Sequence, residues 1–170
     1  MSASFPPVTI REASDSDHMI VLDLFRAIIS EGETYIYTED FSDEALNGIW
    51  FEAPNRAYVV EHEGTVIASF VIRPNKMGRG AHIANAAFIV QKNYQGKGIG
   101  RLMGEYAIDE AKRLGYRAMQ FNIVVSTNIR SVSLWNRLGF RIIGTIPEGF
   151  DHKQLGLVDI YIMYRSLEHK

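Results

Sequence analysis

The stretch VQKNYQGKGIGR, residues 90–101, joins an apolar run to a segment with the periodicity of an amphipathic helix. Its three glycines stand at alternate positions, so side chains do not cover the backbone N–H groups around them. Free N–H groups at the start of a helix, together with the helix dipole, favour binding of an anion such as phosphate. Lys97 and Arg101 add positive charge. The stretch therefore predicts a phosphate-binding loop between a strand and a helix.

This loop does not match the common phosphate-binding motifs. In the dinucleotide fingerprint G-x-G-x-x-G the third glycine stands one position later than it does here, and the P-loop sequence G-x-x-x-x-G-K-[ST] is absent. A glycine-rich turn without a ligand is the alternative. The position between a strand and a helix argues against that alternative, because it places the free N–H groups at a helix start.

Hydrophobic periodicity outside the loop predicts a series of strands and helices. Strands are expected at residues 8–11, 56–61, 65–72, 81–90, 119–125, 140–144 and 158–164. Helices are expected after the start signals at residues 14–17 and 42–45, and over residues 99–114 and 129–138. Strands and helices alternate only in the second half, which indicates a mixed sheet with helices on its faces. The run at residues 81–90 is apolar enough for burial on both faces.

Length and composition fit one globular domain. The chain has 170 residues, of which 46% are apolar and 22% charged, and a domain of this size can bury a core. We expect one domain over residues 8–166, a flexible tail at residues 1–7 and a C-terminal tail at residues 167–170.

Charge and cysteine content narrow the classes of function. The net charge is −2 without a basic stripe, so we expect no nucleic-acid partner. There are no cysteines, which removes disulfides and thiolate nucleophiles, and the five histidines are too scattered for a metal site. The N-terminus lacks the pattern of a secretory signal, and the longest apolar run, residues 86–90, is far shorter than the ~20 residues of a membrane-spanning helix. We therefore expect a cytoplasmic protein that binds neither a membrane nor a metal.

Two motifs resemble the GNAT superfamily of acetyl-CoA-dependent N-acetyltransferases. Gln95-x-x-Gly98-x-Gly100 matches the family signature Q/R-x-x-G-x-G/A, and residues 128–140 (NIRSVSLWNRLGF) resemble its second block. The resemblance covers residues 8–166 and implies the family fold, which is an α/β (α+β) fold with a mixed, mostly antiparallel central sheet flanked by helices. It implies acetyl-CoA as the cofactor, with the pyrophosphate on the loop amides and the pantetheine arm near Asn128. The coenzyme-binding residues that it implies are Phe88, Ile89, Val90, Gln95, Gly96, Lys97, Gly98, Ile99, Gly100, Arg101, Asn128, Ser131 and Trp135.

The resemblance also implies how the acetyl group is transferred. In the family the strand before the loop separates from its neighbour, and a backbone N–H in this strand polarises the thioester carbonyl. Val90 is the expected donor here, and Asn128 is expected to help hold the reacting groups. Many members carry a tyrosine at the position of Trp135, and this tyrosine protonates the departing thiolate. An indole has only an N–H donor and cannot act as that acid, so another group or water does so, or the thiolate leaves unassisted.

Asn85 and Asn122 interrupt two otherwise apolar strands. A buried amide without a partner costs about 1–3 kcal/mol, so the pair favours a polar pocket. A strand irregularity at Asn85 and a simple helix cap at Asn128 are the alternatives. The strings around these asparagines and the loop at residues 31–35 resemble the azetidine-2-carboxylate N-acetyltransferase subgroup. That resemblance implies that Asn85 and Asn122 bind the carboxylate of a proline-like imino acid.

Residues outside these motifs complete the expected acceptor site. Tyr35 and Glu33 are expected to bind the substrate. Glu31 or Glu33 could take the proton of the amine, directly or through water. His82 lies close to Asn85 in the sequence and could also be a base, although a surface role is the stronger expectation.

Together these features predict an enzyme that moves an acetyl group from acetyl-CoA to a small-molecule amine. One alternative is a peptide or protein N-acetyltransferase, which needs an open groove. Another is an acyl-CoA-binding sensor without turnover, which the tryptophan at position 135 permits. In this family strands such as residues 159–164 often help form a homodimer, so a homodimer is expected.

Overall fold

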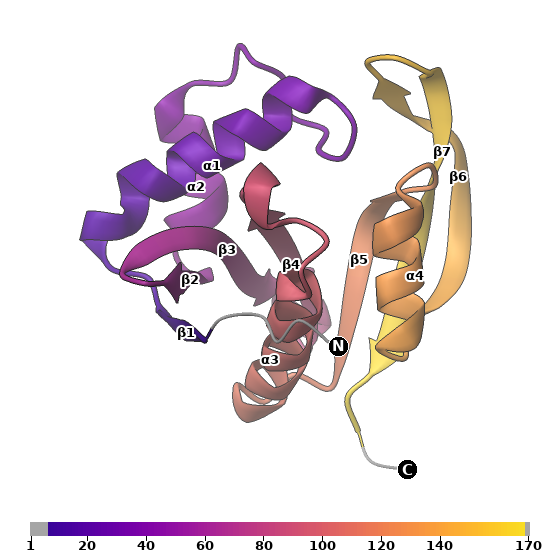
Figure 1. Ribbon diagram of the computed structural model, residues 1–170. Helices are drawn as coiled ribbons and strands as arrows, with labels where there is room; N and C mark the ends of the chain where they lie inside the picture. Colours follow the sequence, from indigo (N-terminus) through magenta and orange to yellow (C-terminus); the bar gives the residue numbers. More distant parts are fainter. Residues whose placement is uncertain (1–6, 169–170) are drawn as a thin grey trace, which may run out of the picture.

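The computed structural model describes residues 7–168 and contains the predicted order of strands and helices (Figure 1). The strands are β1 (Val8–Glu12), β2 (Arg56–His62), β3 (Thr65–Pro74), β4 (Ile83–Val90), β5 (Ala118–Val125), β6 (Arg141–His152) and β7 (Gly156–Ser166). The helices are α1 (His18–Glu31), α2 (Asp43–Phe51), α3 (Ile99–Arg113) and α4 (Ile129–Arg137). Short 3-10 turns lie at Asp15–Asp17, Gly78–Gly80 and Lys92–Tyr94. No helix within residues 7–168 is long and apolar enough to cross a membrane.

The sheet has seven strands in the order β1-β2-β3-β4-β5-β7-β6. Every neighbouring pair is antiparallel except β4 and β5, which are parallel. The prediction of a mixed, mostly antiparallel sheet flanked by helices is therefore confirmed.

The sheet divides where its two parallel strands meet. β4 and β5 pair only at Ile83 with Ala118 and at Ala84 with Met119, which are at the beginning of both strands. Beyond these pairs the strands separate, as Figure 1 shows between β4 and β5. A register irregularity between Phe121 and Val124 interrupts the β5–β7 ladder, and such irregularities bend a strand. The sheet therefore has a four-stranded half, β1–β4, and a three-stranded half of β5, β7 and β6.

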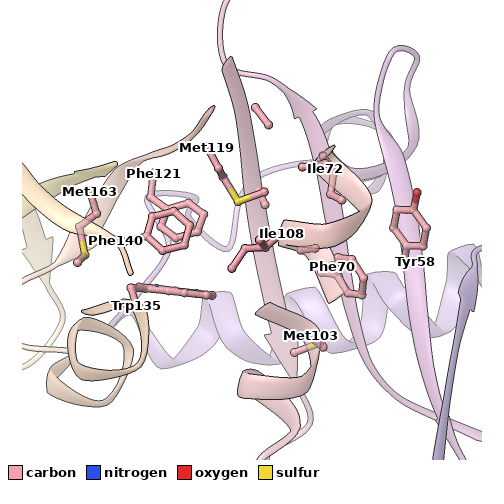
Figure 2. Packing of buried hydrophobic residues seen from close by; sticks show 14 of the residues in the cluster. Tyr58, Phe70, Ile72, Met103, Ile108, Met119, Phe121, Trp135, Phe140 and Met163 are labelled. Carbon is pink, nitrogen blue, oxygen red and sulfur yellow. The ribbon is translucent and has the colours of Figure 1, made fainter. Parts of the chain in front are cut away.

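Two hydrophobic clusters cover opposite faces of the sheet. One contains Met103 of α3, Trp135 of α4 and Phe70 of β3, and several of its side chains appear in Figure 2. The other packs α1 and α2 on the sheet through Phe25 and Trp50. Helices α3 and α4 thus cover one face of the sheet, and α1 and α2 cover the other.

The expectation that the strand within residues 81–90 is buried on both faces is confirmed for β4, although the strand begins at Ile83 and His82 before it is exposed. Ala84 and Ala86 are buried in the cluster on one face and Ile89 in the cluster on the other, while the remaining residues of β4 are half-buried.

The last two strands are longer than expected and form a hairpin. β6 continues through Pro147 to His152, although the sequence predicted its end at Gly144. β6 is an edge strand, where a proline is tolerated because one side of the strand has no partner. The tip of the hairpin binds the C-terminal end of α1: the amide of Lys153 donates to the carbonyl of Gly32 (3.0 Å), and its Nζ donates to the carbonyl of Ser30 (2.9 Å).

The expected tails lie mostly outside the described residues, which exclude residues 1–6 and 169–170. Leu167, which was expected in the C-terminal tail, is only 5% exposed and packs in the larger core cluster. Its amide donates to the carbonyl of Arg117 (2.9 Å), so the end of β7 is fixed to the segment before β5.

Candidate active site

The division of the sheet opens into a cleft of about 1460 Å³ that both halves of the sheet line. Most of the residues predicted for the coenzyme and acceptor sites line this one cleft. They are Glu33, Tyr35, Asn85, Phe88, Val90, Gln95, Gly96, Gly98, Gly100, Arg101, Asn122, Asn128, Ser131 and Trp135. Residues up to about 100 positions apart in the sequence are therefore brought together, as the motifs indicated.

Three side chains predicted to bind the coenzyme do not line the cleft. Ile89 is 1% exposed and packs with α1 and α2, because side chains alternate between the faces of a strand. Ile99 is 2% exposed and is the first core residue of α3. Lys97 points to solvent with its Nζ 5.4 Å from the centre of the Tyr94 ring. Ile89 and Ile99 can therefore contact a ligand in the cleft only through their backbone.

The glycine-rich loop has the backbone geometry of an anion site. Gly96 and Gly98 have φ values of +73° and +88°, which glycine adopts without strain, and Gly98 is the N-cap of α3. A Cβ atom at either position would meet no heavy atom within 4 Å, so the space beside the loop is open to a ligand. Gln95 fixes the start of the loop by donating from Nε2 to the carbonyl of Val90 (3.2 Å). Arg101 pairs with Glu105 (2.8 Å), so the helix N-terminus itself supplies the anion-binding N–H groups.

Alternate backbone amides of β4 face the division in the sheet. The carbonyl of Ile83 accepts from Asn75, and the amide of Gln91 donates to Ile67 of β3, so odd-numbered residues of β4 face β3. Backbone groups of a strand alternate between its two neighbours. The amides of Phe88 and Val90 consequently point toward the side on which β5 has separated from β4.

Tyr35 occupies part of that opening. Its hydroxyl accepts from the amide of Phe88 (3.0 Å) and donates to the carbonyl of the same residue (2.8 Å). The Tyr35 ring packs edge-on against Phe25 of α1, at 5.3 Å between ring centres. Burial raises the pKa of Tyr35 well above its usual range, so the phenol stays protonated at neutral pH.

Helix α4 contributes a polar start and an aromatic wall. Asn128 is its N-cap, and the side-chain Oδ1 accepts from the amide of Ser131 (3.2 Å). Asn128 is thus a helix cap, and it also lines the cleft. Trp135 is 7% exposed, and its ring centre lies 4.9 Å from that of Phe88 and 4.6 Å from that of Phe121. Because Phe88 lies on β4 and Phe121 on β5, Trp135 bridges the two halves of the sheet. Figure 2 shows it beside Phe121 and Phe140.

The predicted asparagines lie in a polar part of the cleft, where both are half-buried. Asn122 Nδ2 donates to Asn75 Oδ1 (2.7 Å), and Gln120 Nε2 donates to Asn122 Oδ1 (3.0 Å). The Asn122 amide is therefore fixed by two neighbours, with one N–H of Nδ2 left for a ligand. Asn85 makes no side-chain hydrogen bond within residues 7–168, and it stands opposite Arg73 of β3.

Arg73 is a residue of the cleft that the sequence did not indicate. Its Nη1 donates to the carbonyl of Ile49 (2.8 Å), but it forms no ion pair with any residue that the structure describes. Its positive charge lies close enough to Tyr35 to oppose the rise in the pKa of that phenol. A half-buried guanidinium without a carboxylate partner suits an anionic ligand. Its sequence context gives no signal of this role, because it reaches the cleft through the position of β3 in the fold.

The candidate bases differ in their surroundings. Glu33 lines the cleft and has no hydrogen bond or ion pair to the rest of the described chain, whereas Glu31 lies 3.9 Å from Lys92 Nζ. His82 is exposed and outside the cleft, as its expected surface role implies. His152, which the sequence did not single out, is buried and lines the cleft. Its Nδ1 accepts from the amides of Gln154 (3.1 Å) and Leu155 (3.2 Å), so the proton of the neutral ring is on Nε2.

Residues 22–140 match the acetyltransferase (GNAT) family. The chain belongs to this family. A GCN5-related N-acetyltransferase from Kribbella flavida is 42% identical and has a TM-score of 0.89, with 94% of this chain and 97% of that chain covered. The fold and the family are thus those of an acyltransferase. The fold of this chain also superposes on that of the yncA protein from Salmonella typhimurium, which was solved with its cofactor acetyl-CoA. The two chains are 23% identical, with a TM-score of 0.84 and 96% of each chain covered.

Among curated relatives, the GNAT chain is 38% identical to N-acetyltransferase aca1 of Schizosaccharomyces pombe over 61% of its own length. It is 26% identical to protein SPT10 of Saccharomyces cerevisiae over 77% of its length. The chain spans 50% of the first relative and 29% of the second.

Proposed function

We propose that this protein is an acetyl-CoA-dependent N-acetyltransferase that acetylates the amine of a small amino or imino acid. One observation carries the proposal: a single cleft joins an anion-binding glycine loop to a polar pocket with an unpaired arginine. Transfer between two substrates requires both to be held next to each other, which such a cleft allows. Membership of the acetyltransferase family supports the reaction.

The residues at one end of the cleft fit acetyl-CoA. Space beside Gly96 and Gly98 leaves room for a pyrophosphate against the start of α3, where N–H groups and the helix dipole favour negative charge. The pantetheine arm would then lie between β4 and the N-terminus of α4, near Asn128 and Ser131. The match to the yncA protein, solved with acetyl-CoA, agrees with this assignment of the cofactor.

The residues of the polar pocket fit a carboxylate. Asn122 presents an N–H of an amide whose orientation is fixed, and Asn85 has an uncommitted amide. Arg73 supplies a positive charge that no carboxylate of the described chain neutralises. Glu33 and Tyr35 line the same region. A free amino or imino acid, including a proline analogue such as azetidine-2-carboxylate, carries both the carboxylate and the amine that this arrangement suits.

The reaction needs a neutral amine and a donor for the oxyanion. Glu33 takes a proton from the amine, directly or through water, and the amine nitrogen bonds to the acetyl carbon. A backbone amide that faces the division, that of Val90 or Phe88, donates to the thioester oxygen as negative charge develops on it. The C–S bond then breaks. Trp135 cannot supply a proton to the sulfur, so the thiolate leaves unassisted or takes a proton from water.

A homodimer is part of this proposal. β6 is an edge strand with exposed Ile142, Ile143 and Ile146. Exposed apolar edge strands favour pairing with another chain, and a second copy is the partner that we expect. Light scattering in solution tests this, and a monomer at all concentrations would contradict it. The cytoplasmic location expected from the sequence stays a prediction.

The experiment that tests the proposed function measures thiol release from acetyl-CoA. The acceptors to compare are free amino acids, proline analogues, polyamines and short peptides. Turnover with amino or imino acids, lost when the carboxylate of the acceptor is amidated, is the expected result. Turnover with peptides alone would replace the small-molecule acceptor, and acetyl-CoA binding without any turnover would favour a sensor.

A further inference from the structure

The hydroxyl of Tyr35 forms hydrogen bonds with a single residue of β4, the strand that borders the cleft. It holds both backbone groups of Phe88, at 3.0 Å from the amide nitrogen and 2.8 Å from the carbonyl oxygen. Tyr35 lies 53 positions away in the sequence, on the loop that follows α1. A side chain has therefore taken the place that a backbone of β5 would take if the strands had not separated.

The position of Phe88 along β4 places this contact at the inner part of the cleft. The glycine loop follows the C-terminal end of β4, and Phe88 lies two residues further in than Val90, about 7 Å at 3.3 Å per residue. A ligand whose phosphates bind the loop and whose arm follows β4 passes Val90 before it reaches Phe88. The amide of Phe88 is thus the deeper of the two donors that face the division, next to the polar pocket.

We propose that the Tyr35 hydroxyl and the Phe88 amide together form the oxyanion site for the acetyl thioester. In the structure the Tyr35 oxygen accepts the Phe88 N–H, as a thioester oxygen would. A thioester oxygen that takes over this N–H displaces the hydroxyl by a short distance, and the O–H can then donate to the same oxygen. This inference rests on the proposed function and assigns the donor residues of its chemical step.

The surroundings of Tyr35 suit a neutral donor and not a proton-transferring acid. Its ring is held against Phe25, so the hydroxyl is positioned before any ligand binds. Burial keeps the phenol protonated by raising its pKa. A thiol has a pKa of about 8.5, so proton transfer from this phenol to a thiolate would be unfavourable. Tyr35 thus contributes a hydrogen bond to the oxyanion, and no bond to its proton breaks.

The variant Tyr35→Phe removes the hydroxyl and keeps the ring. We expect kcat to fall by about 10²-fold, the loss typical of one oxyanion donor, while the Kd of acetyl-CoA does not rise. The matched control is Tyr37→Phe, which removes the hydroxyl of the neighbouring tyrosine, one that makes no hydrogen bond within residues 7–168. An unchanged kcat in Tyr35→Phe, with tighter acetyl-CoA binding, would show that the hydroxyl only occupies the site and would overturn the proposal.

A second measurement does not depend on turnover. The infrared stretch of carbonyl-labelled acetyl-CoA bound to the protein should lie at lower frequency in the wild type than in Tyr35→Phe, because a hydrogen bond weakens the C=O bond. Equal frequencies would overturn the role of Tyr35 even if no acceptor is ever found, whereas absence of turnover alone would contradict only the proposed function. If Tyr35→Phe does not fold, fluorotyrosine at position 35 keeps both hydrogen bonds and, as a stronger donor, should lower the frequency further.

Discussion

At the scale of single residues, Gly98 and Gly115 offer a matched comparison. Both have φ of +88°, and a Cβ at either would meet no heavy atom within 4 Å, but only Gly98 borders the cleft. We predict that alanine at either position costs about 1–2 kcal/mol of stability from the left-handed backbone alone. Only Gly98→Ala should also weaken acetyl-CoA binding, because its methyl group occupies the space beside the loop. Thermal unfolding and titration calorimetry measure the two effects.

The comparison separates strain from ligand contact. Equal losses of stability, with a raised Kd in Gly98→Ala alone, would support the loop as the pyrophosphate site. An unchanged Kd of acetyl-CoA in a folded Gly98→Ala variant would contradict the assignment of the loop as the pyrophosphate site, because Gly115→Ala controls for the backbone strain.

Asn122 tests the charge of the acceptor. We predict that Asn122→Ala raises the KM of the acceptor about 10-fold or more, because a hydrogen bond to a charged group is worth about 1.5–3 kcal/mol. Asn122→Asp keeps the shape and adds a negative charge, so its effect on an acceptor with a carboxylate should be larger. Steady-state kinetics with both substrates varied give the two KM values. A smaller rise in the acceptor KM for Asn122→Asp than for Asn122→Ala would mean that the group of the acceptor next to residue 122 is not anionic.

The residues of the coenzyme end could be predicted because their signal is local. The glycine spacing and the block at 128–140 each lie within one short segment of the chain, so the sequence itself contains their geometry. Arg73 and His152 had no such signal. They reach the cleft only because β3 and the β6–β7 hairpin lie beside it, and nothing in a short window of sequence reports that proximity.

At the scale of elements, the packing of α3 on α4 depends on a small residue. A Cβ at Gly104 would lie 2.6 Å from Leu138 Cδ1 and 3.0 Å from the Trp135 ring, whereas one at Gly100 would lie 3.4 Å from Leu134. Alanine usually stabilises a helix interior by about 0.5–1 kcal/mol relative to glycine. We predict that Gly104→Ala instead destabilises the protein by about 1–3 kcal/mol through overpacking.

The control for this prediction is Gly100→Ala in the same helix, which should unfold at a temperature equal to or above that of the wild type. Tryptophan fluorescence should change in Gly104→Ala, since the Trp135 ring must move to admit the methyl group. A stabilised Gly104→Ala protein would mean that α4 adjusts without cost and that Trp135 is not fixed by this contact.

The element order followed from periodicity, but the lengths of the last two strands did not. A proline and two glycines between residues 144 and 149 indicate a break in a strand, yet β6 continues through them. Its ladder with β7 shifts register between Ile142 and Gly144 and again between Ile146 and Phe150, and these irregularities absorb the non-ideal residues. Such irregularities depend on the partner strand, and the sequence of one strand does not contain them.

At the scale of the whole molecule, a sheet with only two residue pairs between β4 and β5 needs other connections across its division. The aromatic cluster around Trp135 provides one, beneath the cleft. The β6–β7 hairpin provides another, because the amide of Lys153 bonds to the carbonyl of Gly32 and Lys153 Nζ bonds to that of Ser30. The second connection also holds His152 at the wall of the cleft. Closure of the hairpin on the α1 loop should therefore affect binding of the acceptor as well as stability.

Gly32 makes this closure testable. It has φ of +65°, and a Cβ there would lie 2.7 Å from Lys153 Cβ. Gly156 at the other side of the hairpin has φ of +73°, with no heavy atom within 4 Å of such a Cβ. Alanine at either position carries the left-handed strain of about 1–2 kcal/mol, but only Gly32→Ala must push the hairpin away. We predict that Gly32→Ala alone accelerates hydrogen exchange at the Lys153 amide and raises the KM of the acceptor. Equal exchange in both variants would mean that the hairpin stays closed without this contact, and the aromatic cluster would then be the main connection between the two halves of the sheet.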